Sequence, residues 1–138
     1  MTFEEWVDFY NRKNPKAKFE RDKRTNLLFD EEHGFCEVFF DKDMVYIGQT
    51  CGDGRWWLKH VEDVARKMGI KHGGTYDSRS QILAYMRLFG YKLKEVIDLP
   101  DGYKRYLAVH KKTGKGFRAS PAYVYDDGKV AYMVTWEI

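Results

Sequence analysis

The sequence has few cysteines, few prolines and no long apolar run, and each absence excludes a class of protein. Two cysteines in 138 residues, Cys36 and Cys51, cannot form a disulfide framework. Three prolines among many apolar and aromatic residues indicate a folded chain rather than a disordered one. No apolar stretch approaches a membrane span, no Cys/His spacing resembles a metal site, and the acidic start MTFEEWVDFY does not resemble a signal peptide. We therefore expect a cytoplasmic protein with no membrane span and no metal.

The sequence also lacks a large excess of charge of either sign. The 24 basic residues exceed the 21 acidic ones only slightly, for a net charge of +3, and they concentrate mildly over 12–24 and 104–118. Dedicated nucleic-acid binders usually carry a stronger bias or a clustered stripe. The pattern argues against nucleic acid as a partner and favours a solvated surface with some field for an anionic ligand.

Apolar residues are plentiful, and their spacing predicts one α+β domain over residues 1–138. Aromatic side chains make up 17% of the chain, so large rings are expected to fill much of the core. Helical spacing occurs over 3–12, from Trp57 to Met68, and around 80–89, and Thr2 followed by Glu5 has the spacing of a capping box at the start of the first helix. Strand patterns occur over 27–29, 35–40, 44–49, 70–76 and 91–97, followed by a β-meander over 103–138 with a tight turn at Asp127-Gly128. We expect a mixed, largely antiparallel central sheet with flanking helices.

The most distinctive motif is Gln49-Thr50-Cys51-Gly52-Asp53-Gly54, which lies between a β-rich run and an amphipathic helix. Helix N-termini expose unpaired N–H groups and the positive end of the helix dipole, and glycines let the backbone approach an anion closely. This context predicts an anion-cradling loop. A plain tight turn fits the same residues equally well.

The motif resembles the pyrophosphate-binding signature of the GNAT superfamily of acyl-CoA-dependent N-acyltransferases. That signature consists of Arg or Gln, two variable residues, Gly, one variable residue, and Gly or Ala, and Gln49, Gly52 and Gly54 match it. Two further stretches, 65–69 (ARKMG) and 84–91 (AYMRLFGY), are similar to the ends of the family's following helices. The resemblance covers 35–97 and implies a GNAT-like fold with acetyl-CoA as co-substrate. The implied activity is acetyl transfer to a primary amine of an unidentified acceptor.

The resemblance also assigns roles around the signature. The amides of Thr50, Cys51 and Asp53 would face the phosphates of acetyl-CoA. The Asp53 carboxylate departs from the pattern, so it is expected to cap the next helix. Arg55 would offset its charge.

A general acid follows from the same resemblance. Tyr85 would act as the general acid toward the departing thiolate, with Tyr76 and Tyr91 as alternatives, although Tyr85 stands one residue earlier than the family pattern requires. Glu37 is a candidate for the general base on its position alone, since it lies on a strand that leads to the predicted site and could deprotonate an incoming amine directly or through water. The alternative for Glu37 is a place on the polar face of an alternating strand.

Other functions remain open at this point. The chain departs from the family before residue 35 and after 97, which leaves room for a catalytically silent GNAT-like scaffold or interaction protein of the kind that phages and mobile elements encode. Cys51 at a helix N-terminus would have a lowered pKa, but no His stands at the distance that a cysteine protease requires. Trp56, Trp57 and the C-terminal tyrosines could stack on single-stranded nucleic acid only if they were clustered and exposed.

Overall fold

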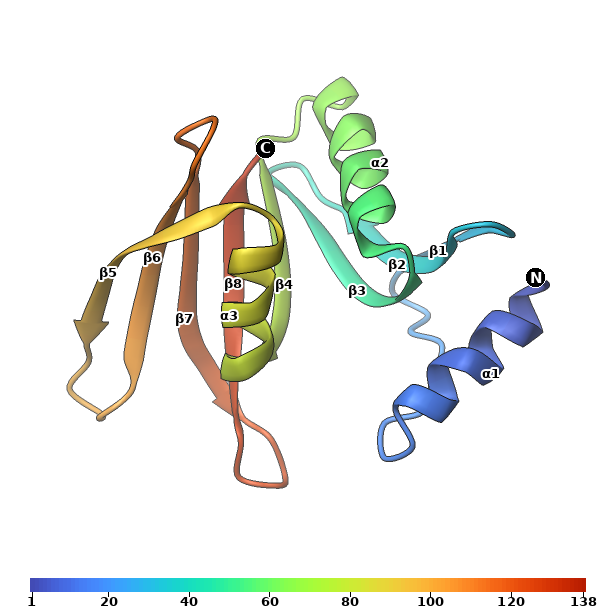
Figure 1. The fold of residues 1–138 in the computed structure, drawn as a ribbon, viewed down its shortest axis with the longest axis horizontal. Helices are drawn as coiled ribbons and strands as arrows, with labels where there is room; N and C mark the ends of the chain where they lie inside the picture. Colours follow the sequence, from blue (N-terminus) through green and yellow to red (C-terminus); the bar gives the residue numbers. More distant parts are fainter. The chain divides into compact units, whose positions relative to one another are not determined.

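The computed structural model describes all 138 residues, Met1 to Ile138, and divides into two compact units, Met1–Ile70 and Lys71–Ile138. Both units combine helix with strand, so the α+β class is confirmed (Figure 1). Every strand pairing described within a unit is antiparallel. The expectation of one domain over the whole chain stays a prediction.

The first unit is a three-stranded antiparallel sheet with two helices. Its strands pair in the order β1-β2-β3, and the bounds are α1 Phe3–Lys13, β1 Asn26–Asp30, β2 Gly34–Phe40, β3 Met44–Gly52 and α2 Gly54–Lys67. Helix α2 buries Trp57, Val61 and Ala65, which share one face at helical spacing. The apolar periodicity of the sequence therefore fixes which side of α2 is buried.

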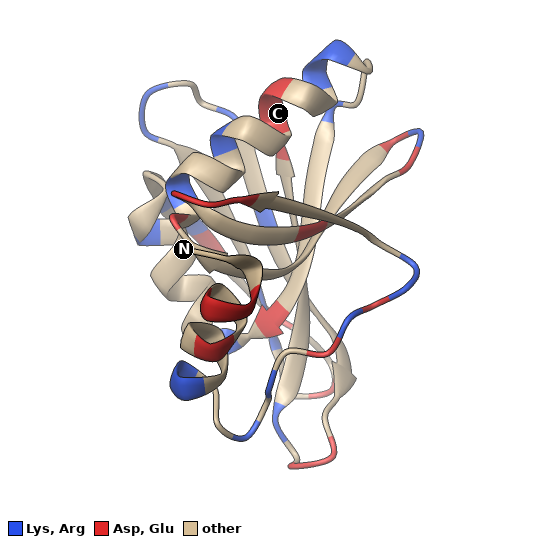
Figure 2. Cartoon of the chain, turned by 90° about the vertical axis from the view of Figure 1, so that its right-hand side faces the viewer, with Lys and Arg blue, Asp and Glu red and all other residues tan.

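Helix α1 has strong local sequence signals for a helix but packs only weakly against the rest of the unit. Thr2 and Glu5 form the expected capping box, acidic residues occupy the first turn and basic residues the last (Figure 2). No residue of α1 is buried. Helix α1 contacts the sheet through aromatic rings: the ring centroid of Phe3 lies 5.6 Å from that of Phe35, and the ring centroid of Tyr10 lies 5.7 Å from it.

The second unit is a five-stranded antiparallel sheet with one helix. Its strands pair in the order β4-β8-β7-β6-β5. The bounds are β4 His72–Ser78, α3 Arg79–Leu88, β5 Tyr91–Asp98, β6 Lys104–His110, β7 Gly116–Val124 and β8 Val130–Glu137. The expected helix and strands of this half are thus confirmed to within a few residues. The tight turn at Asp127-Gly128 is confirmed too, because the Tyr125 N–H donates to the Lys129 carbonyl at 2.7 Å.

The core of the second unit lies between α3 and one face of the sheet. Ile82 and Met86 are the buried residues of α3, and Tyr132, Val134 and Trp136 alternate along β8 with less buried residues. Edge strand β5 is mostly exposed and carries charged residues, a common defence against pairing with other chains. Both Lys and Arg and Asp and Glu occur in helices, strands and loops (Figure 2). None of the three helices combines the length and apolarity that a bilayer crossing demands.

Gly73 provides a test of the packing in the second unit. A Cβ at this position would collide with the indole ring of Trp136, which is only 8% exposed. We expect Gly73→Ala to lower the free energy of unfolding by about 1–3 kcal/mol, as overpacking does, in a urea titration followed by tryptophan fluorescence. Gly54→Ala is the control, since a Cβ there would meet nothing within 4 Å. Equal midpoints for the two variants would contradict the packing of Trp136 against β4.

Candidate functional site

The segment predicted as an anion-cradling loop is mostly strand, which corrects that expectation. Strand β3 continues to Gly52, and Thr50 and Cys51 are paired with β2. The cause is the glycine pair Gly34 and Gly52, which lie opposite one another in the ladder. A Cβ on Gly52 would collide with the carbonyl oxygen of His33, so only paired glycines allow the strands to stay together this far. The backbone here is part of a sheet and does not curve around an empty centre.

One residue, Asp53, separates β3 from α2. Its N–H donates to the His33 carbonyl at 3.0 Å, and its carboxylate accepts from the Trp56 N–H at 3.1 Å. Asp53 is therefore the N-cap of α2, as expected, and Gly54 and the exposed Arg55 open the helix. The cap also places a carboxylate at the positive end of the helix, where it repels an approaching phosphate.

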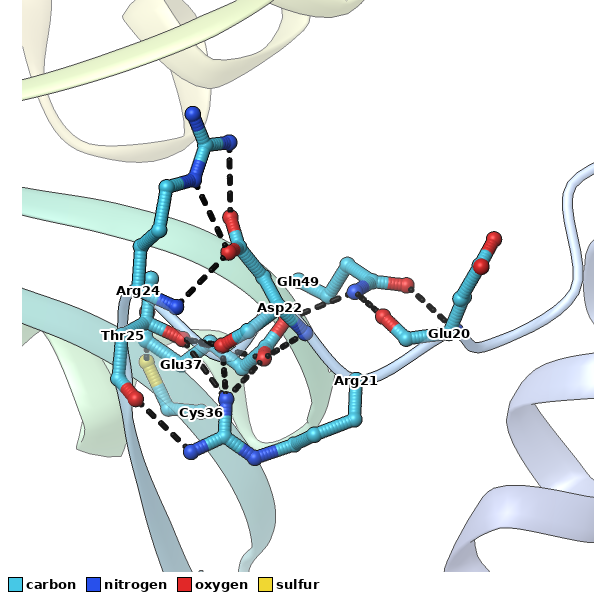
Figure 3. A network of polar contacts seen from close by, with 8 residues as sticks. All are labelled: Glu20, Arg21, Asp22, Arg24, Thr25, Cys36, Glu37 and Gln49. Carbon is cyan, nitrogen blue, oxygen red and sulfur yellow. Dashed lines mark hydrogen bonds and ion pairs between the residues drawn. The ribbon is translucent and has the colours of Figure 1, made fainter.

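Glu37 is buried at the centre of a polar network in the first unit (Figure 3). Its Oε2 accepts from Arg21 Nη1 at 2.7 Å and from the Asp22 N–H at 2.9 Å, and the Thr25 hydroxyl lies 3.0 Å away. Only 1% of the Glu37 side chain is exposed, so it does not lie on a solvated strand face. The surrounding donors compensate the burial of its charge.

Gln49 belongs to the same network and does not point away from the sheet toward a ligand. Its Nε2 donates to Glu37 Oε1 at 2.6 Å and to the Glu20 carbonyl at 2.6 Å, as Figure 3 shows. The structure thus brings together two predicted site residues, one expected to bind a cofactor and one expected to be catalytic. Together these two residues hold the polar segment 20–25, which contains no helix or strand.

Both thiols of the first unit are poor nucleophiles. Burial raises the pKa of Cys36 to about 11, although the Thr50 hydroxyl at 3.4 Å partly opposes the shift. Burial likewise raises the pKa of Cys51 above its ordinary value, with the charge of Lys13 acting in the opposite direction. The expectation of a lowered Cys51 pKa is therefore wrong: Cys51 lies within β3, before the helix starts, and its side chain is 6% exposed.

Tyr85, the expected general acid, belongs to the second unit, whereas Glu37 and 49–55 belong to the first. Its hydroxyl donates to Asp77 Oδ2 at 3.1 Å, and burial raises the pKa of the Asp77 carboxyl. The two alternatives lie in other ring clusters of this unit. Tyr76 packs near Tyr123 at 5.7 Å, and Tyr91 near Phe117 at 4.9 Å.

Two features escaped the sequence analysis. In the first unit, the Trp56 ring stacks on the rings of His33 and His60, with 3.9 Å and 5.0 Å between the ring centroids. The Trp56 ring is therefore already stacked within the protein. The spacing of four between Trp56 and His60 signals half of this stack, but nothing in the sequence places His33 there.

In the second unit, a groove of about 660 Å³ is lined by Ser78, Arg79, Ser80, Leu83, Gly102, Tyr103, Lys104, Tyr106, Lys129, Val130 and Tyr132.

No family model, curated protein or solved structure matches the chain. The resemblance to the GNAT superfamily therefore stays a prediction that rests on the residues between Phe35 and Ile97. What the site can do must be argued from its own geometry.

Glu37→Gln tests the structural weight of the network. Removing the charge leaves Arg21 without its carboxylate partner, and loss of one partner of a buried pair costs several kcal/mol. Because the Arg21 side chain is 37% exposed, we expect a smaller loss of about 2 kcal/mol in the free energy of unfolding, measured by chemical denaturation. Asp63→Asn is the matched control, since it breaks only surface ion pairs with Lys59 and Arg66. A loss for Glu37→Gln no greater than that of the control would contradict the assignment.

The thiols give a second test. With raised pKa values and buried sulfur atoms, neither Cys36 nor Cys51 should react quickly with Ellman's reagent at pH 8 in the folded protein. Both should react at once in guanidinium chloride. One fast-reacting thiol under native conditions, mapped to Cys51 by peptide mass, would restore the idea of an activated cysteine at the helix start.

Proposed function

We propose that this chain is a binding protein whose GNAT-like elements serve as a scaffold, without transfer of an acetyl group. The observation that carries the proposal is the engagement of Glu37. A general base needs a lone pair that faces its substrate. The Glu37 carboxylate is instead buried, and both of its oxygens accept hydrogen bonds from the protein.

The start of α2 supports the same conclusion. A pyrophosphate group carries negative charge and needs free N–H donors. Here the Asp53 carboxylate takes the donor of Trp56, and the Asp53 N–H is bonded to His33. Binding of acetyl-CoA at this point would bring like charges together unless Asp53 were displaced from its capping position.

The expected acid is also engaged. Transfer of the acetyl group leaves a thiolate, which Tyr85 would have to protonate. Its hydroxyl hydrogen bonds to Asp77, a residue of its own unit. A phenol that already donates to a carboxyl group must break that bond before it can donate elsewhere.

Amine-dependent release of CoA from acetyl-CoA tests the proposal. We expect a panel of polyamines, aminoglycosides and lysine peptides to give no release above the background of a sample without protein, with thiol formation followed by Ellman's reagent. Isothermal titration with acetyl-CoA, CoA and ATP runs in parallel to separate binding from turnover. Release that depends on both an amine and the protein would overturn the scaffold proposal.

Acetyl transfer is kept as the second candidate because of one observation. Gln49, Gly52 and Gly54 do occupy the passage from a strand into a helix of 14 residues, as the resemblance implies. If the passage holds acetyl-CoA, Gly54→Val should abolish both CoA binding and release, because a branched side chain at the helix start would block the approach. Asp53→Asn, which keeps a capping side chain but removes its charge, should then strengthen binding.

A further inference from the structure

The groove of the second unit is a concave site that plays no part in the predicted acetyl-CoA signature. It lies where the start of α3, the turn between β5 and β6, and the hairpin between β7 and β8 come together. Its volume of about 660 Å³ is within the ordinary range for small-molecule sites. Two buried rings, Tyr106 and Tyr132, line it together with the more exposed Tyr103.

The charge of the lining is of one sign. Arg79, Lys104 and Lys129 contribute cations, and no Asp or Glu lines the groove. Arg79 is held in place by a neutral group, because its Nε donates to the Tyr106 hydroxyl at 2.6 Å. That contact orients the guanidinium group without neutralising it, which leaves its other N–H groups able to serve a ligand.

Carboxylates near the groove lie outside its lining, although the charge of Asp101 adds to the effect of burial in raising the pKa of Tyr132. Asp98 forms an ion pair with Lys104 at 2.8 Å, so that lysine is partly neutralised. Asp101 accepts from the Tyr103 N–H, and Asp127 from the Lys129 N–H. Asp77 is the hydrogen-bond partner of Tyr85. Arg79 and Lys129 are therefore the cations that set the preference of the groove for an anion.

Hydroxyl groups and flat rings complete the lining. Ser78 and Ser80 flank Arg79, and their hydroxyls lie 3.4 Å apart. Burial raises the pKa of Tyr132 above its ordinary value, so this phenol is neutral and can donate a hydrogen bond at physiological pH. Leu83 and Val130 supply apolar surface between the polar groups. Cations beside aromatic and aliphatic groups suit a ligand that joins an anionic group to a planar ring.

We propose that this groove binds a nucleoside phosphate, with the phosphate at Arg79 and Lys129 and the base against the exposed ring of Tyr103. The same chemistry occurs in a free nucleotide and in a single-stranded oligonucleotide. The inference does not depend on the proposed scaffold function, since no residue of 49–55 lines the groove.

Titration with adenosine 5′-monophosphate, adenosine and a ten-residue oligodeoxyadenylate tests the proposal, with binding followed by two-dimensional amide NMR. We expect the monophosphate or the oligonucleotide to bind at least ten-fold more tightly than adenosine and to shift the amides of Ser80 and Tyr103. Tighter binding of the oligonucleotide identifies a strand as the ligand, and tighter binding of the monophosphate identifies a free nucleotide. Absence of binding at millimolar concentrations, or equal binding of adenosine, would overturn the proposal.

Variants locate the phosphate. Arg79→Gln should weaken the binding of the phosphorylated probe by roughly ten-fold or more, as loss of a charged hydrogen bond does. Lys129→Gln should weaken it by a smaller factor and serves as the second test if Arg79→Gln lowers the melting temperature. Lys112→Gln, on the exposed turn between β6 and β7, is the matched control and should change affinity less than two-fold. Unchanged affinity in both groove variants would refute the assignment.

The acetyl-CoA titration is kept separate from this test. Acetyl-CoA also contains a phosphorylated adenosine, so any heat of binding must be assigned to a unit. Loss of that heat in Arg79→Gln places it in the groove, whereas loss in Gly54→Val places it at the start of α2. Failure of the scaffold proposal and failure of the groove proposal therefore give different results.

Discussion

The first unit depends on the burial of one carboxylate. Glu37 lies in the middle of a strand whose neighbours are apolar, and an ionised group in that position is costly unless donors surround it. Those donors come from the segment before β1, through Arg21 and the Asp22 amide, and from β3 through Gln49. The need to satisfy Glu37 therefore orders a polar stretch that has no regular structure, and it takes Gln49 away from any ligand.

A partner that is distant in the sequence also explains why the sequence motif and the structure disagree. Local signals predicted the elements well: the Thr2–Glu5 capping box, the buried face of α2 and the Asp127-Gly128 turn all depend on near neighbours in the chain. The extension of β3 to Gly52 depends on Gly34, which lies 18 residues earlier and was not part of the motif. A Gly-rich stretch before a helix is predicted to be a loop when the strand that pairs with it is not known.

The candidate site shows the same limit. Burial of Glu37 and its pairing with Arg21 across 16 residues could not be predicted from alternation alone, because consecutive residues of β2 from Gly34 to Val38 are all buried and the strand has no solvated face there. The groove of the second unit is built from three segments that lie apart in the sequence, and none of them carries a motif that predicts a site. Asp53 was the exception, since Asp before a helix is a favoured cap whatever surrounds it.

Strand β8 has a central place in the second unit, since it pairs with β4 on one side and β7 on the other. In the pairing of β4 with β8, His72 lies opposite Glu137, the last residue of β8. Strands β5, β6 and β7 instead follow one another as simple hairpins. During synthesis on a ribosome, the hairpins can form as soon as they emerge, but β4 has no partner within its own unit until β8 has left the exit tunnel. Closure of this sheet is therefore a late event in the life of the nascent chain, and α3 must wait for its full apolar support until then.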